Sequence, residues 1–138
     1  MNTTPLKPMM ILLIEDNPAD VEMARVTLEE SGLSHVLQVA EDGEEALILL
    51  TKKDASKNTA IPDLILLDIN LPKLSGKEVL QSIRGDEKLK NIPVMVLTSS
   101  YAKKDISDFY RLEADYYLTK PLNVEDFKTA LGYGAAPA

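Results

Sequence analysis

One short segment, Leu64 to Asp68, limits what this chain can fold into more than any other. Four apolar residues in a row end in a single acid, and turn and helix-start residues follow as far as Gly76. A short apolar run bounded by such breakers predicts a strand that is buried on both faces of a sheet. Such a strand is expected to end where open α/β sheets bind ligands, so Asp68 is a candidate functional residue. The alternative is a strand-terminal Asp that only caps the next turn or helix.

Strand and helix patterns alternate five times along the chain. The predicted strands cover residues 9–14, 36–40, 64–67, 93–97 and 114–118, and the predicted helices cover 17–32, the region of 46–50, 76–84, the region of 106–110, and 123–131. This alternation predicts an α/β fold: a doubly wound (βα)5 unit with a five-stranded parallel sheet, in the flavodoxin-like order 2-1-3-4-5. A polar loop is expected over 52–60. The domain is expected to span 9–132, with tails at 1–8 and 133–138.

Charge and composition exclude several classes of function. The net charge of −7 disfavours nucleic acid and anionic membrane surfaces as partners. The chain has no Cys and one His, His35, so thiolate chemistry and multi-His metal sites are excluded. No apolar run approaches the ~20 residues of a membrane span, and the first residues lack the apolar core of a signal peptide. We therefore expect a cytoplasmic protein.

The predicted strand ends bring chemistry-bearing residues to one edge of the sheet. These residues are Glu15 and Asp16 after the first strand, Asp68 after the third, Thr98 after the fourth, and Lys120 after the fifth. Three carboxylates in one place repel one another, so a cation is expected among them. Hard oxygen ligands favour Mg²⁺, and the backbone carbonyl of Asn70 is a candidate further ligand.

The same residues suit phosphoryl transfer. A carboxylate such as Asp68 can attack phosphorus and carry an acyl phosphate. In this interpretation Lys120 pairs with the phosphoryl group and the Thr98 hydroxyl binds one of its oxygens. Each residue alone also has an ordinary structural explanation, such as β-propensity for Thr98 or a solvated surface side chain for Lys120.

Four segments carry a resemblance to a known family over nearly the whole chain. They are ILLIEDNPAD, LILLDINLPKLSG, PVMVLTSS and YYLTKP. In this order and at these spacings, the chain resembles a two-component response-regulator receiver domain. The EDNPAD start and the long loop after the second helix resemble the single-domain regulators that partner bacterial phytochromes.

The resemblance implies a function and a set of roles. It implies phosphorylation of Asp68 by a sensor histidine kinase or a histidine phosphotransfer protein, with Mg²⁺ at Glu15, Asp16, Asp68 and the Asn70 carbonyl. It also implies a switch pair, Thr98 and Tyr117, and a cis Lys120–Pro121 bond. Asn70 and Ser100 flank the site and are expected to tune the lifetime of the acyl phosphate.

Two positions depart from the family pattern. Glu113 stands where the family usually has Gly, so a left-handed turn there would be strained. The last helix looks short, because Gly132 and Gly134 interrupt it. The family commonly uses the fourth helix, fifth strand and fifth helix for output or homodimer contacts. The two departures lie next to or within these elements, so they affect which partner this face would select.

The favoured interpretation is a stand-alone phosphoacceptor that is not an enzyme and loses its phosphoryl group slowly. Three other functions compete with it. An aspartate-nucleophile phosphatase commonly has a second Asp two residues after the nucleophile, but Asn70 stands there and transfers protons poorly. A flavodoxin-like cofactor binder needs a donor-rich, uncharged loop after the first strand, but EDNPAD would repel phosphate. A receiver acting only as an unphosphorylated scaffold would lack site residues, but none is missing.

Overall fold

The computed structural model describes residues 7–51, 61–99, 107 and 111–132. Five parallel strands form one sheet in the order β2-β1-β3-β4-β5, which confirms the predicted fold class. The described elements are β1 (Met9–Ile14), α1 (Pro18–Glu30), β2 (His35–Ala40), α2 (Gly43–Thr51), β3 (Leu64–Asp68), α3 (Gly76–Arg84), β4 (Val94–Thr98), β5 (Tyr116–Thr119) and α5 (Val124–Ala130).

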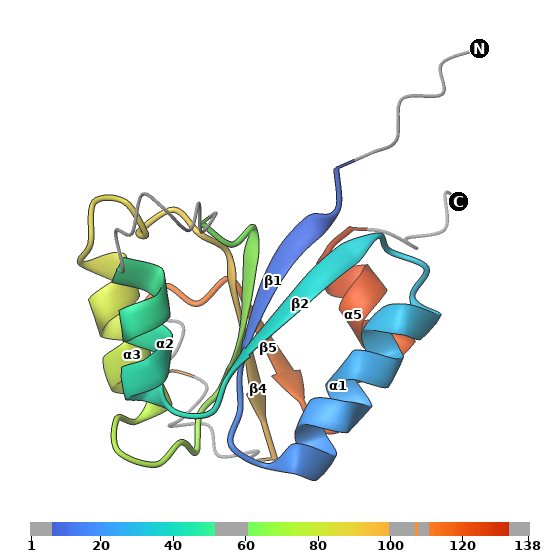
Figure 1. The fold of residues 1–138 in the computed structure, drawn as a ribbon, viewed down its shortest axis with the longest axis horizontal. Helices are drawn as coiled ribbons and strands as arrows, with labels where there is room; N and C mark the ends of the chain where they lie inside the picture. Colours follow the sequence, from blue (N-terminus) through green and yellow to red (C-terminus); the bar gives the residue numbers. More distant parts are fainter. Residues whose placement is uncertain (1–6, 52–60, 100–106, 108–110, 133–138) are drawn as a thin grey trace.

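The helices cover both faces of the sheet (Figure 1). On one face α1 and α5 pack against a core that includes Leu28 and Phe127, both almost completely buried. On the other face α2 and α3 pack against a core that includes Ala46 and Leu80. Every residue of β3 is buried, as the continuous apolar run predicts.

Local signals fix where α1 and α3 begin. Asn17 caps α1, because its side chain accepts hydrogen bonds from the backbone N–H groups of Ala19 and Asp20 at 2.8 and 3.3 Å. Ser75 and Glu78 form a reciprocal capping box at the start of α3. These two helix starts lie at the edge of the sheet that carries the candidate site, so the caps also order the site.

Some predicted boundaries were wrong by one or two residues. The fifth strand was predicted over 114–118, but pairing runs from Tyr116 to Thr119. The chain is still turning before it: Glu113 has a φ of +67°, the left-handed conformation suspected from the missing Gly. The fourth strand begins at Val94 and includes Thr98 as its last residue, not as the residue that follows it.

Smaller corrections concern the other elements. The second strand begins at His35, one residue earlier than predicted. The last helix is confined to Val124–Ala130. In the charged segment 86–91 after α3, the one apolar residue, Leu89, is 2% exposed and packs in the same core as α3. The expected polar loop at 52–60, Ser100 and, apart from residue 107, the expected helix near 106–110 lie outside the described residues.

Candidate functional site

The register of the two central strands places two carboxylates side by side. Ile14 of β1 pairs with Leu67 of β3, and Glu15 and Asp68 are the residues that follow them in the chain. Both are 2% exposed. Adjacent parallel strands lie about 4.8 Å apart, so two acids at the same level must share their surroundings.

The register on the other side of β3 adds a hydroxyl and an ammonium group. Asp68 pairs with Leu97, so Thr98 lies one step further along β4 and is completely buried. Thr98 in turn pairs with Thr119, which places Lys120 directly after β5 at the same edge of the sheet. The Lys120–Pro121 peptide bond that follows is cis.

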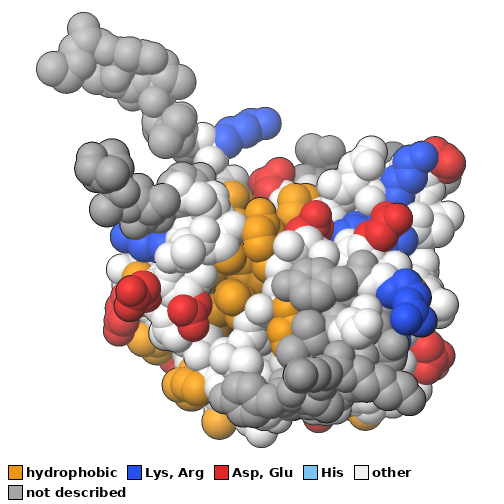
Figure 2. All heavy atoms as spheres, turned by 180° about the vertical axis from the view of Figure 1, so that it is seen from behind, with side chains coloured by type: hydrophobic (Ala, Val, Ile, Leu, Met, Phe, Trp, Pro, Cys, Tyr) orange, Lys and Arg blue, Asp and Glu red, His pale blue; other side chains and the backbone are white. Residues whose placement is uncertain are grey.

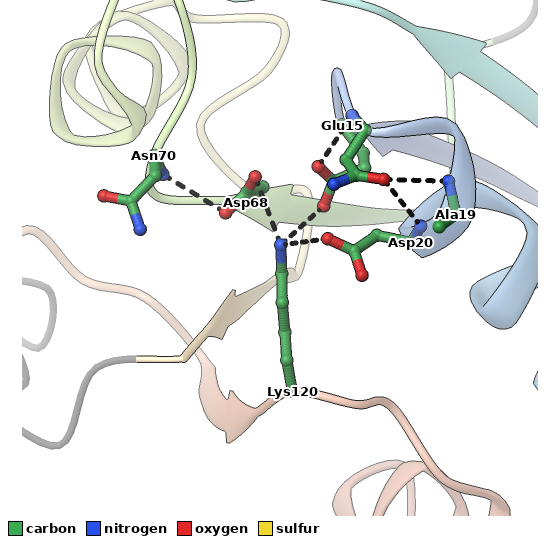
Figure 3. A network of polar contacts seen from close by, with 7 residues as sticks. Glu15, Ala19, Asp20, Asp68, Asn70 and Lys120 are labelled. Carbon is green, nitrogen blue, oxygen red and sulfur yellow. Dashed lines mark hydrogen bonds and ion pairs between the residues drawn. The ribbon is translucent and has the colours of Figure 1, made fainter.

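The ammonium group of Lys120 contacts three carboxylates (Figure 3). Its Nζ lies 2.8 Å from an oxygen of Glu15, 3.0 Å from one of Asp20 and 3.3 Å from one of Asp68. The Lys120 side chain is 19% exposed, so water screens these ion pairs only in part. One cation thus bridges residues from β1, α1 and β3.

Burial and charge shift the pKa values of two of these groups. Burial, together with the neighbouring Asp68, raises the pKa of Glu15 to about 7 against the opposing hydrogen bond from Lys120. Burial alone would lower the pKa of Lys120, but its hydrogen bonds to Glu15 and Asp20 raise it above the usual value. Glu15 is therefore a carboxylate that one ammonium group does not fully compensate.

Three acids are arranged as a metal ion would need them. Glu15, Asp16 and Asp68 each offer a carboxylate oxygen, and these oxygens all lie within 4.8 Å of one another. Glu15 and Asp68 are buried and Asp16 is exposed, so the group opens toward solvent on one side. Hard oxygen donors with excess negative charge fit a divalent cation.

The loop after β3 is tied to this group through Asn70. Its backbone N–H donates a hydrogen bond of 3.1 Å to Oδ1 of Asp68, while Oδ2 of Asp68 faces Lys120. The two carboxylate oxygens of Asp68 therefore have different surroundings, one neutral donor and one cation (Figure 3). Asn70 therefore lies beside the acids through its backbone N–H, and the role of its backbone carbonyl as a further metal ligand stays a prediction.

Comparison with known proteins identifies the family. A family model described as the response regulator receiver domain matches residues 11–132. This chain belongs to that family. The resemblance inferred from the four sequence segments is therefore confirmed.

Individual receiver proteins resemble this one closely over most of their length. Response regulator Rcp1 of Synechocystis sp. is 42% identical over 126 residues, which are 91% of this chain and 86% of the relative. The structure of its Mn²⁺-bound form has a TM-score of 0.77 and covers 91% of each chain. The bacteriophytochrome response regulator AtBRR is 37% identical with a TM-score of 0.82, covering 96% of this chain and 97% of that one. The phosphorylated cyanobacterial phytochrome response regulator RcpA is 40% identical with a TM-score of 0.78, covering 91% of each chain.

The two residues of the predicted switch pair of the receiver domain lie on β4 and β5. Thr98 ends β4 beside Asp68, and Tyr117 pairs with Val96 on the neighbouring strand. Tyr117 is half-buried and packs against the core on the side of α2 and α3. Their predicted roles as a switch pair remain predictions.

Sequence reasoning missed one residue of the receiver domain's site, Asp20. Its carboxylate is 3.0 Å from the ammonium of Lys120, a residue 100 positions away in the chain. The available signal was its place in EDNPAD, four residues after Asp16 and in the first turn of α1. That turn starts beside the end of β1, so an acid there can reach the same edge of the sheet.

Proposed function

We propose that the receiver domain, over residues 9–132, accepts a phosphoryl group on Asp68 from a phosphohistidine. The donor would be a sensor histidine kinase or a histidine phosphotransfer protein. The observation that carries the proposal is the placement of Asp68, which is 2% exposed, 3.3 Å from the Lys120 ammonium and within 4.8 Å of two further carboxylates. A buried acid next to a cation and a divalent-ion cluster suits nucleophilic attack on phosphorus.

The transfer itself needs few groups. A carboxylate oxygen of Asp68 attacks phosphorus, a P–O bond forms, and the P–N bond to the donor imidazole breaks. The imidazole nitrogen keeps the electron pair of that bond and takes up a proton from solvent. On this chain, the Lys120 ammonium pairs with one phosphoryl oxygen and the Thr98 hydroxyl donates to another.

Mg²⁺ is the cofactor we propose, held by Glu15, Asp16, Asp68 and the backbone carbonyl of Asn70. When bound, it would neutralise charge on the phosphoryl oxygens. Two observations support this choice: the three carboxylates fit a hard divalent ion, and the relative Rcp1 has been solved with Mn²⁺. The relative RcpA has been solved in a phosphorylated form.

Phosphorylation is proposed to act as a switch of protein contacts. Thr98 would bond to the phosphoryl group, and Tyr117 would turn inward beside it.

Figure 1 places β2 nearest the viewer, so Figure 2 looks toward the β5 edge, where a strip of hydrophobic side chains lies among charged ones. This β5 and α5 side, with the expected fourth helix outside the described residues, is our proposed surface for an output partner or a homodimer.

Finer details of the proposal concern turnover and the kinase. We propose slow autodephosphorylation, not enzymatic turnover, because Asn70 transfers protons poorly. Asn70 and Ser100 would tune the lifetime of the acyl phosphate. The names of the relatives AtBRR and RcpA support a phytochrome-type sensor kinase as the donor. No helix in the described part of the chain could cross a membrane.

Acetyl phosphate with Mg²⁺ tests the phosphoacceptor directly. Intact mass spectrometry should show one added phosphoryl group on the wild type and none on Asp68→Asn. Glu87→Gln is the matched control, since it removes an acid whose side chain is 87% exposed and pairs only with the nearby Lys90 among the described residues. A label that persists in Asp68→Asn, or no label on the wild type with any donor, would reject the proposal.

A further inference from the structure

Asp20 is an acid of the site that belongs neither to the metal-fitting group nor to the nucleophile. Its carboxylate lies 3.0 Å from the Lys120 ammonium, closer than the 3.3 Å that separates this ammonium from Asp68. In Figure 3, Asp20 and Asp68 approach the ammonium from different directions. The Asp20 side chain is 34% exposed and lies in the first turn of α1.

A closed ring of hydrogen bonds fixes Asp20 in this place. Oε1 of Glu15 accepts the backbone N–H of Asn17 at 3.1 Å, and the side chain of Asn17 accepts the N–H of Asp20 at 3.3 Å. The carboxylate of Asp20 accepts from Lys120, which donates at 2.8 Å to Oε2 of Glu15 and so closes the ring. Asp20 therefore reaches Lys120 from a backbone that is already anchored to Glu15.

The ammonium of Lys120 and a divalent cation would compete for the same carboxylate oxygens. Both would lie against Glu15 and Asp68, and two cations in one place repel each other. A third carboxylate that binds the ammonium from outside the group of Glu15, Asp16 and Asp68 weakens this competition. The negative charge of that carboxylate also partly offsets the positive charge of Lys120, so the repulsion between Lys120 and the divalent cation is weaker.

We propose that Asp20 is a positioning residue that holds Lys120 so that Glu15 and Asp68 stay available to the divalent cation. The inference rests on the proposed metal-assisted phosphoacceptor function and adds a residue to it. The competing explanation is structural: an acid in the first turn stabilises a helix through its dipole and does nothing more. The two explanations differ in whether the effect of Asp20 depends on Lys120.

Binding of Mn²⁺, followed by the electron paramagnetic resonance signal of the free ion near neutral pH, tests the role of Asp20. Asp20→Asn should weaken Mn²⁺ binding roughly fivefold, the order expected for a partly exposed charged hydrogen bond. The matched control is Glu22→Gln, which removes the same charge from the same helix. The Glu22 side chain is 68% exposed and pairs with Arg25 instead. An effect of Asp20→Asn no larger than that of Glu22→Gln would overturn the inference.

A double-mutant cycle with Lys120→Met separates positioning from a simple effect of charge. If Asp20 acts through Lys120, Asp20→Asn should have no more effect than Glu22→Gln once Lys120 is replaced. A loss that persists in the Lys120→Met background would reject positioning. Asp20→Glu provides a second measurement in case Lys120→Met does not fold: it keeps the carboxylate and should stay within about twofold of the wild type. A loss as large as that of Asp20→Asn would contradict the inference.

The same titration distinguishes failure of this inference from failure of the proposed function. If the wild type binds no Mn²⁺, the metal-assisted function fails and Asp20 has nothing to support. If the wild type binds Mn²⁺ and Asp68→Asn weakens it, the metal site stands. The comparison of Asp20→Asn with Glu22→Gln then decides the role of Asp20 alone.

Discussion

The guanidinium group of Arg84 donates two hydrogen bonds to the carbonyl oxygen of Glu113, from Nε at 2.9 Å and from Nη2 at 2.8 Å. The same group reaches Asp115 at 2.8 Å and the carbonyl of Ile92 at 2.8 Å. The end of α3 therefore holds both the turn before β4 and the turn before β5. This support allows Glu113 to keep a φ of +67°, a conformation that Gly would adopt with less strain.

Replacing Glu113 by Gly should stabilise the protein. A left-handed conformation costs a non-Gly residue about 1–2 kcal/mol, which Gly would not incur. The greater conformational freedom of Gly in the unfolded chain offsets part of this stabilisation. We expect a net gain of about 0.5–1 kcal/mol in the free energy of unfolding, measured by urea denaturation. The control Glu22→Gly, inside α1, should instead lose about 1 kcal/mol. A loss in Glu113→Gly would show that the side chain of Glu113 contributes more than its backbone costs.

Replacing Arg84 by Lys should destabilise the protein although the charge is kept. An ammonium group cannot reproduce the planar fork that contacts two separate segments, the turn before β4 and the turn before β5. The Arg84 side chain is only 12% exposed, so the carbonyl oxygens left without donors are poorly hydrated. The expected cost is about 2 kcal/mol. Arg25→Lys, at a surface pair with Glu22, should stay within about 0.5 kcal/mol in the same denaturation experiment.

Low pH should reduce the stability of the folded protein by protonating Asp42, which caps α2. Its carboxylate accepts the backbone N–H of Glu45 at 2.8 Å and lies 3.4 Å from Lys73. The hydrogen bond from Glu45, and then Lys73, hold the pKa of Asp42 below its usual 3.8. Because the pKa is lower in the folded state, the stabilisation is present above that usual value and is lost as the pH falls through the folded value.

The comparison of wild type with Asp42→Asn isolates this contribution. Thermal unfolding followed by circular dichroism from about pH 6 to about pH 3 should show the wild type more stable at the upper end, with the difference shrinking toward the lower end. Asn can still cap a helix, so the difference reports mainly on the charge. A constant difference across this range would contradict the assignment to Asp42.

Much of the fold could be predicted because its signals are local. The apolar runs of β1 and β3, the Asn17 cap and the capping box at Ser75 each lie within a few residues, and they fix strands and helix starts directly. Glu15, Asp16 and Asp68 could also be placed together, because parallel strands end at a shared edge.

Other features could not be predicted because they depend on side chains that meet across the fold. Arg84 and Glu113 are 29 residues apart, and nothing near either residue indicates their contact. The left-handed conformation of Lys73, with a φ of +66°, has no Gly or Asn to announce it. In the sequence, Asp20 looks like an ordinary acid in the first turn of a helix, and only the structure shows its contact with Lys120.

Gly76 sets how closely the loop after β3 can approach the start of α3. A Cβ at this position would lie 2.7 Å from the Cα of Ile69 and 3.0 Å from the carbonyl oxygen of Asp68. Both neighbours are backbone atoms of the segment that carries Asp68, so they cannot move aside as a flexible side chain would. Gly76→Ala should therefore push the segment that carries Asn70 away from the acids.

Two measurements should change together in Gly76→Ala. Stability to urea should fall by about 1–3 kcal/mol, the usual cost of overpacking, and Mn²⁺ binding should weaken because Asp68 is displaced. Gly85→Ala is the matched control: its φ is −87° and its nearest contact would be 3.3 Å, from the carbonyl oxygen of Gln81. We expect that control to change stability by less than about 1 kcal/mol and to leave Mn²⁺ binding unaltered. Unchanged Mn²⁺ affinity in Gly76→Ala would mean that the loop after β3 can shift without moving the carboxylate of Asp68.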